Sequence, residues 1–145
     1  MRLVDANVLI YAVNEASTQH EGARAWLDQA LGGEETVGFA WSVLLAFLRL
    51  TTHPAVFAQP LDPAAATAIV RAWTEQPTAR LIDPTPRHLE VLSGLLAESG
   101  TAANLVTDAH LAALAIENDA VLVTFDADFG RFKGLRTERP GQEAA

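Results

Sequence analysis

The sequence predicts one three-layer α/β/α domain around a central parallel sheet, and three observations support this fold class. Short apolar segments of strand type alternate with longer segments of helical periodicity, which is typical of crossovers between parallel strands. The strand segments, such as AVLVTF at 120–125, are apolar on both faces, as expected where helices cover both sides of a sheet. A chain of 145 residues, half of them hydrophobic, is long enough to form one core.

The strands are predicted from short apolar runs that end at polar or turn-forming residues. In chain order they are 2–5, 36–39, 80–82, 120–124 and a short fifth strand near 135. No internal repeat or linker interrupts the pattern. We therefore expect a single domain over 1–138, followed by a frayed tail over 139–145.

The helices are predicted from apolar periodicity together with capping residues at their starts. In chain order they are 7–13, 17–31, 42–51, 62–75, 85–98 and 107–118. Their expected caps are Ser17 or Thr18, Asp62 before Pro63, Thr85 before Pro86, and Thr107. The 42–51 segment is apolar almost all round, which indicates a buried helix.

Composition excludes several classes of function. The absence of cysteine excludes disulfides, thiolate metal sites and cysteine nucleophiles. No run approaches the roughly 20 apolar residues that span a bilayer, and the N-terminus does not resemble a signal peptide, so we expect a cytoplasmic protein without membrane contact. A net charge of −8 argues against a broad basic surface for nucleic acid. Four cations near the C-terminus either belong to a solvated tail or hold the phosphates that flank a bound phosphodiester: Arg131, Lys133, Arg136 and Arg139.

Aspartates fall where strands end and where a helix begins. Asp5 closes the first strand, Asp108 opens a helix, and Asp126 and Asp128 follow the 120–124 strand. Sites in open parallel sheets form beyond the carboxyl ends of strands. Crowded carboxylates are costly unless a cation neutralises them, and oxygen ligands favour Mg²⁺ or Mn²⁺. The pattern predicts a metal site for phosphoryl chemistry.

Other polar residues near these acids are candidates for supporting roles. Asn7 either orients Asp5 or binds substrate, or else it caps a helix. Thr124 either hydrogen-bonds a carboxylate or a metal-bound water, or is a β-branched strand residue, and we favour the hydrogen bond. Asn104 either contacts phosphate or has a loop or capping role. The histidines lack paired metal-ligand spacing, so we interpret all four as structural: His20, His53, His88 and His110. The large aromatic residues on helices are interpreted as packing residues: Trp26, Trp41, Trp73 and Phe47.

Three segments together resemble PIN-domain ribonucleases, and more narrowly the VapC-type toxins of bacterial toxin–antitoxin pairs. These segments are LVDANVLIYA, TDAHLAALAIE and LVTFDADFGRF, and the resemblance continues through LLAFLRLTTHPAVF. It implies a PIN-like fold, a Mg²⁺- or Mn²⁺-dependent endoribonuclease activity, a VapB-type antitoxin as partner, and a homodimer. By matching motif, Asp5 and Asp108 are the principal metal ligands, Asp126 is the third acid, and Asp128 lies close by.

One position departs from this resemblance. Many PIN domains carry a glutamate on the helix after the second strand, whereas the segment SVLLAFLRLTT has no acid and the matching position falls near Leu44. Two interpretations follow: Asp128 takes over part of that role, or a second metal ion is held weakly.

The predicted reaction is hydrolysis of RNA phosphodiesters, with tRNA or rRNA as substrate, by water that the metal activates. The first alternative is a PIN-like module that binds RNA or protein with weakened catalysis. The second is a HAD-type phosphatase, but that fold requires DxD on its first strand and a later lysine. Here DxD comes last, and the only lysine is Lys133.

Overall fold

The centre of the molecule is a five-stranded sheet with the strand order β3-β2-β1-β4-β5. The computed structural model describes residues 1–100 and 103–142. All four neighbouring strand pairs are parallel, which confirms the predicted sheet. The strands are β1 (Arg2–Val4), β2 (Val37–Ala40), β3 (Ala79–Ile82), β4 (Val121–Val123) and β5 (Thr137–Glu138).

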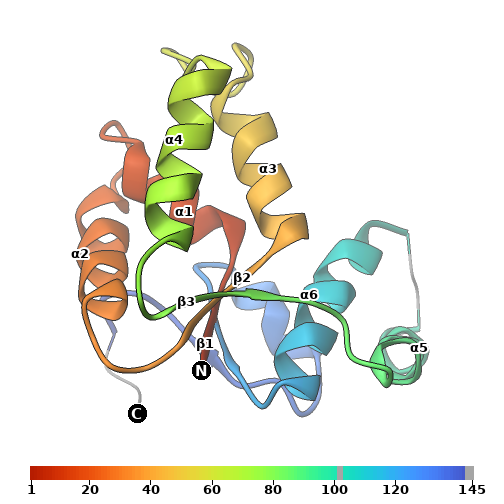
Figure 1. The fold of residues 1–145 in the computed structure, drawn as a ribbon. Helices are drawn as coiled ribbons and strands as arrows, with labels where there is room; N and C mark the ends of the chain where they lie inside the picture. Colours follow the sequence, from red (N-terminus) through yellow and green to blue (C-terminus); the bar gives the residue numbers. More distant parts are fainter. Residues whose placement is uncertain (101–102, 143–145) are drawn as a thin grey trace.

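Helices cover the sheet from both sides. Helices α1 and α2 lie on one side of the sheet and α6 on the other, with α5 packed against α6, while α3 and α4 form a hairpin that extends beyond the sheet (Figure 1). In the part of the chain that the structure describes, no helix is long and apolar enough to cross a membrane. The α-helices are α1 (Ala6–Val13), α2 (His20–Leu31), α3 (Trp41–Thr51), α4 (Pro63–Thr74), α5 (His88–Ser99) and α6 (Val106–Glu117). Two short 3₁₀ helices are η1 (Ala103–Leu105) and η2 (Ala127–Arg131).

The core forms where the apolar strands meet the apolar helix faces. All four residues of β2 are buried, and α6 buries a continuous stretch from Leu111 to Ala115. Phe47 on α3 is fully buried and packs edge-to-face on Trp73, with ring centroids 5.0 Å apart. This confirms the packing interpretation of Phe47. Trp41, at the start of the same helix, is 50% exposed and is not a core residue.

One predicted helix cap is confirmed, and three others are wrong. The carboxylate of Asp62 accepts a hydrogen bond of 2.8 Å from the N–H of Ala65, so it caps α4 as expected. Helix α2 begins only at His20, and helix α6 begins one residue before Thr107, directly after η1. Helix α5 begins at His88 rather than at residue 86. The hydroxyl of Thr85, the expected cap, accepts the N–H of Arg87 at 3.2 Å, ahead of the first helical residue, and its backbone N–H donates to Glu117.

The order of the strands determines which segments meet at the carboxyl end of the sheet. Val4 of β1 lies beside Val123 of β4, and the N–H of Asp5 donates to the Val123 carbonyl at 2.9 Å. On the other side of β4, Thr124 donates its N–H to the carbonyl of Glu138 at 2.9 Å. The chain segments that follow β1, β4 and β5 are therefore neighbours.

The predicted domain boundary at residue 138 coincides with the end of β5. The folded part continues past it, however, because Arg139 donates a hydrogen bond to the carbonyl of Phe125 and Pro140 is buried. These two residues do not belong to a frayed tail. Residues 143–145 of the predicted tail lie outside the described residues.

Candidate active site

Four aspartates lie at the carboxyl end of the sheet. Asp5 directly follows β1, Asp126 and Asp128 follow β4, and Asp108 lies in the first turn of α6. Nearby Asp108 and Asp126 raise the pKa of Asp5, and nearby Asp126 and Asp128 raise the pKa of Asp108. Asp5 is thus within electrostatic reach of Asp108 and Asp126, and Asp108 is within reach of Asp126 and Asp128.

Asp5 is held firmly by the elements around it. One carboxylate oxygen accepts the N–H of Ala6 at 2.7 Å and caps α1, and the other accepts the hydroxyl of Thr124 at 2.7 Å. Burial is the main reason why the pKa of Asp5 is raised, although the hydrogen bonds from Thr124 and Ala6 lower it. Burial therefore outweighs those bonds, and the negative charge of Asp5 is poorly compensated by the protein alone.

Asn7 and Thr124 link β1 to β4 beside Asp5. The amide nitrogen of Asn7 donates to Asp5 Oδ2 at 3.3 Å and to Thr124 Oγ1 at 3.2 Å. Its amide oxygen accepts the N–H of Phe125 at 3.2 Å, and Thr124 Oγ1 also accepts the N–H of Asp126 at 3.0 Å. Because Asp5 is the residue that caps α1, the capping alternative for Asn7 does not apply. Both polar residues hold Asp5 and the segment after β4 in one arrangement.

Asp108 is partly buried at the start of α6, where the helix dipole favours a negative charge. Burial raises the pKa of Asp108, and the neighbouring Asp126 and Asp128 raise it further. The guanidinium of Arg131 acts in the opposite direction and lowers that pKa. Arg131 is therefore a cation within electrostatic reach of the acids, a placement that its position three residues after Asp128 suggests.

Asp126 and Asp128 have different surroundings. Asp126 caps η2, because its Oδ1 accepts the N–H of Asp128 at 2.9 Å. The side chain of Asp128 is 72% exposed and lies 3.7 Å from the Arg131 guanidinium. Asp126 has an extended backbone conformation, whereas Asp128 lies within η2. Asp126 is therefore held by a hydrogen bond to the backbone, whereas the side chain of Asp128 is largely exposed to solvent.

Comparison with known proteins places the chain in a family. The PIN domain pattern matches residues 2–135. Ribonuclease VapC37 of Mycobacterium tuberculosis is 52% identical over 140 residues, which cover 97% of each chain. The chain belongs to the PIN-domain family, within its VapC group. Ribonuclease VapC33 of the same species is 42% identical over 99% of this chain and 100% of its own length. The resemblance noted from the sequence is confirmed.

Solved structures share this PIN fold. VapBC2 from Rickettsia felis, bound to a DNA fragment from its promoter, has a TM-score of 0.72 at 18% identity, over 96% of this chain and 98% of that chain. VapC20 of Mycobacterium tuberculosis, described as a sarcin–ricin loop cleaving toxin, has a TM-score of 0.67 at 19% identity, over 94% and 99%. At these identities the likeness establishes the fold alone. It confirms the predicted PIN-like α/β/α class, which differs from the HAD-type alternative.

PIN-domain ribonucleases are metal-dependent as a class, and the donors at this site fit a hard divalent cation because they are all carboxylate oxygens. Within residues 1–100 and 103–142, however, no three acidic or histidine side chains come close enough together to hold an ion. Asp5 and Asp126 hold neighbouring hydroxyl and N–H donors instead. The carboxylates are near enough to disfavour one another's charge, and a cation between them would relieve that repulsion.

Two positions that were expected to contribute to the PIN site are not among the residues described there. Leu44, the position nearest to the family's helix glutamate, is fully buried in the core, and α3 contains no acidic residue. Asn104 lies in η1 just before α6, but its side chain lies outside the described part of the structure. The residues described as gathered at the site are therefore Asp5, Asn7, Asp108, Thr124, Asp126, Asp128 and Arg131.

Proposed function

We propose that this protein is a metal-dependent endoribonuclease and the toxin of a toxin–antitoxin pair. The observation that carries this proposal is the set of mutually repelling carboxylates at the carboxyl end of a PIN-domain sheet. The 52% identity to a ribonuclease across nearly the whole chain supports the same activity. A site that concentrates negative charge requires a cation before it can accept a phosphodiester.

We propose Mg²⁺ as the ion, with Mn²⁺ as a substitute, and Asp5, Asp108 and Asp126 as its ligands. When bound, such an ion supplies a Lewis acid that lowers the pKa of water and offsets the charge that builds up on the reacting phosphate. Asp128, which is more exposed, contributes charge to the same site. We infer that it takes over part of the role of the missing helix glutamate.

The other residues of the chain position these ligands. Asn7 and Thr124 both donate hydrogen bonds to Oδ2 of Asp5, and these bonds hold the carboxylate in one orientation. The raised pKa of Asp5 and that of Asp108 mean that protons compete with metal for both carboxylates. Cleavage should accordingly fall as the pH is lowered toward the acidic range.

An RNA cleavage assay tests the activity. The purified protein is incubated with tRNA, rRNA and a sarcin–ricin loop oligonucleotide, in the presence of Mg²⁺, Mn²⁺ or a chelator. We expect discrete products that depend on the metal and are absent for the Asp108→Asn variant. If Mg²⁺ binds but no RNA is cleaved, the alternative of a PIN-like RNA- or protein-binding module is correct.

We propose a VapB-type antitoxin as partner, by analogy with the VapBC complexes among the structural neighbours. Co-purification with the product of an adjacent small gene, accompanied by loss of cleavage, tests this pairing. A homodimer is also proposed, because Trp41 and Leu45 expose 50% and 58% of their area one turn apart on α3. Light scattering that shows a monomer at high micromolar concentration would contradict the dimer. These partners imply a cytoplasmic location.

A further inference from the structure

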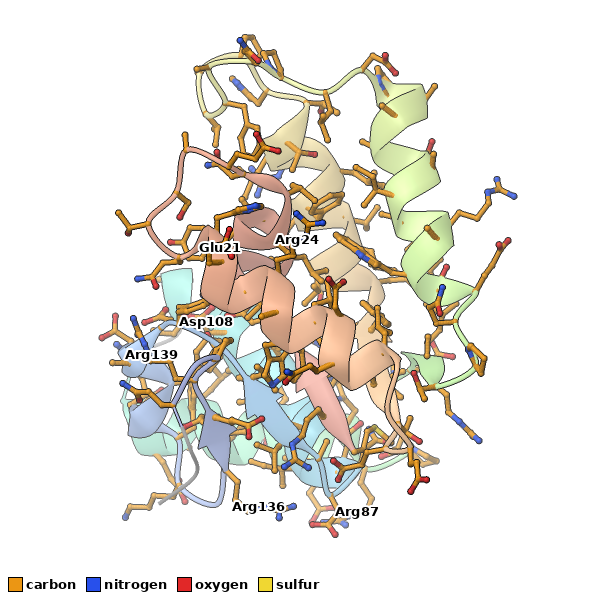
Figure 2. The ribbon with its side chains drawn as sticks, turned by 90° about the vertical axis from the view of Figure 1, so that its left-hand side faces the viewer. Glu21, Arg24, Arg87, Asp108, Arg136 and Arg139 are labelled. Atoms are coloured by element: carbon orange, nitrogen blue, oxygen red, sulfur yellow. The ribbon has the colours of Figure 1, made fainter. Side chains whose placement is uncertain are left out.

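Arg139 lies at the same edge of the sheet as the acids. It directly follows β5, whose neighbour β4 leads into Thr124 and Asp126. Figure 2 shows Arg139 at the level of Asp108, whereas Arg136, on the other side of β5, lies at the opposite edge. The strand thus separates two arginines that are close in sequence, and of these two only Arg139 lies at the edge of the sheet where the acids are.

The guanidinium of Arg139 is held by a carbonyl and an aromatic ring rather than by a carboxylate. Its Nη1 donates to the carbonyl of Phe125 at 2.9 Å, and its Cζ lies 5.0 Å from the centre of the Phe125 ring. Phe125 is fixed in turn by the edge of Tyr11, with ring centroids 5.3 Å apart. Because Arg139 covers the ring of Phe125, that ring is not a free platform for stacking a base.

Arg139 also differs from the other arginines in its balance of charge and burial. Among the described residues, four arginines form ion pairs: Arg2, Arg24, Arg131 and Arg136. Four others have no ion pair and are exposed: Arg49, Arg71, Arg80 and Arg87. Arg139 is the one described arginine that is partly buried and has no acidic partner within 4.0 Å. A guanidinium has five N–H donors, and among the described residues Arg139 makes one hydrogen bond, to the Phe125 carbonyl.

A short chain of hydrogen bonds connects this cation to the acid site. Arg139 binds the Phe125 carbonyl, the Phe125 N–H binds Asn7, and Asn7 binds Asp5. Each link is part of the arrangement that holds Asp5. The guanidinium is therefore fixed in position relative to the carboxylates, and fixing it in advance reduces the entropy lost when it binds an anion.

We propose that Arg139 binds an RNA phosphate next to the scissile one and so sets the path of the substrate strand across the site. This proposal rests on the ribonuclease activity proposed above. A chain of net charge −8 needs a local cation to hold a polyanion beside four carboxylates. The planar guanidinium, with several free donors, suits a phosphate better than a point charge does.

Three variants test the role of this charge. Arg139→Gln removes the charge but keeps a donor for the Phe125 carbonyl, Arg139→Lys keeps the charge, and Arg136→Gln is the matched control at the opposite edge of β5. Initial rates are measured against RNA concentration, and thermal unfolding is recorded for each protein. We expect Arg139→Gln to raise KM about five- to tenfold with kcat nearly unchanged. Arg139→Lys should recover part of this loss, and Arg136→Gln should behave like the unmodified protein.

Binding provides a readout that does not depend on cleavage. Affinity for labelled single-stranded RNA is measured over a salt series in the Asp108→Asn background. Loss of one phosphate contact should make the slope of log affinity against log salt shallower by about 0.7 for Arg139→Gln, with no change for Arg136→Gln. If both arginine variants give the same KM and the same salt slope, the proposal is wrong. If the unmodified protein does not cleave RNA, the proposed function fails, and the binding series alone decides the role of Arg139.

Discussion

Two groups of ionisable side chains share helix α6, and they differ in how completely their charges are matched. Asp108 in the first turn faces the acids at the end of the sheet. His110 and Glu117 belong to the second group, together with His88 of α5. Glu117, whose side chain is fully buried, accepts the N–H of Thr85 at 2.7 Å and pairs with His88 Nδ1 at 2.9 Å.

The residues of the histidine group are linked by hydrogen bonds that run from Glu117 through His88 to His110. A carboxylate can only accept hydrogen bonds, so His88 donates from Nδ1 to Glu117, and its Nε2 lies 2.9 Å from His110 Nδ1. The two rings meet edge-to-face with centroids 4.8 Å apart. Burial and the neighbouring His88 lower the pKa of His110, while Glu117 raises it. Together these contacts fix α5 against α6.

The comparison shows which of the two groups contains charges that the protein itself does not compensate. In the histidine group the Glu117 carboxylate accepts from two donors and the two rings bind each other, so the group joins α5 to α6. In the acid group burial and like charges raise the pKa of Asp5 and of Asp108, so their ionised forms lower the stability of the metal-free protein. Such uncompensated sites are typical of function. Substitutions in the two groups should therefore affect different properties.

The largest expected effect is on catalysis. Asp5→Asn and Asp108→Asn should each lower kcat by about 10³-fold or more, because each removes a proposed metal ligand. Asparagine still caps helices well, so the fold should survive at Asp5. Single-turnover cleavage of RNA in saturating Mg²⁺ measures the change.

The same two variants should be as stable as the unmodified protein without metal, or more stable, because each loses a repelled carboxylate. Thermal unfolding in a chelator provides this control. Activity at the unmodified level in either variant would show that the substituted residue is not a ligand. A large loss of stability would instead mean that the carboxylate serves the fold.

Substitution in the histidine group should have the opposite profile. Glu117→Gln leaves only one acceptor where two donors now bind, and should reduce the free energy of unfolding by about 1–3 kcal/mol. Cleavage below the unfolding temperature should be unchanged. Glu98→Gln on the exposed part of α5 is the matched control, with an expected effect within about 0.5 kcal/mol. Chemical denaturation measures both, and a loss of cleavage by folded Glu117→Gln would link the two groups.

Much of this arrangement could be predicted from the sequence, because it depends on local signals. Apolar runs indicate the strands, and the placement of Asp5 and Asp126 directly after two of them indicates a shared edge once the sheet is parallel. Thr124 was identified because it lies two residues before Asp126. These inferences need only the order of the elements and the geometry of a parallel sheet.

Features that depend on tertiary contacts could not be predicted in this way. The backbone N–H of Thr85, before α5, donates to Glu117, which is 32 residues away, and no local pattern predicts this contact. The contact between Arg139 and Phe125 exists only because β5 lies beside β4. Leu44 shows a third limit: the motif places it near the missing glutamate, but only the packing shows that it is a core residue.

A smaller effect is expected when the stability of Asp108→Asn is compared with that of the unmodified protein over a pH series. The pKa of Asp108 in the folded state is raised above its ordinary value of 3.8. Between 3.8 and the raised pKa, the folded protein binds more protons than the unfolded chain. The stability that Asp108 contributes is therefore present at low pH and is lost as the pH rises through the raised pKa. The advantage of Asp108→Asn in metal-free unfolding should be near zero at about pH 4 and grow toward about pH 7. A difference that is constant with pH would show that Asp108 does not carry this penalty.

The two acids after β4 should respond differently to substitution, and the effect expected at Asp128 is the smallest. Asp126 caps η2, and its charge raises the pKa of Asp5. As a proposed ligand of the ion, it should, when replaced in Asp126→Asn, cause loss of activity and of Mg²⁺ affinity together. Asp128 is 72% exposed and paired with Arg131 at 3.7 Å, which suits a residue that adds charge without binding the ion directly.

We therefore expect Asp128→Asn to lower the rate severalfold at low Mg²⁺ and to recover as Mg²⁺ is raised, because lost affinity is restored by mass action whereas lost coordination geometry is not. Arg131→Gln is the matched control, since it frees Asp128 from its ion pair and should shift the Mg²⁺ dependence in the opposite direction. Initial rates over a Mg²⁺ series decide the question. An unshifted curve for Asp128→Asn would mean that this carboxylate serves only the turn in which it lies, and that nothing on this chain replaces the missing helix glutamate.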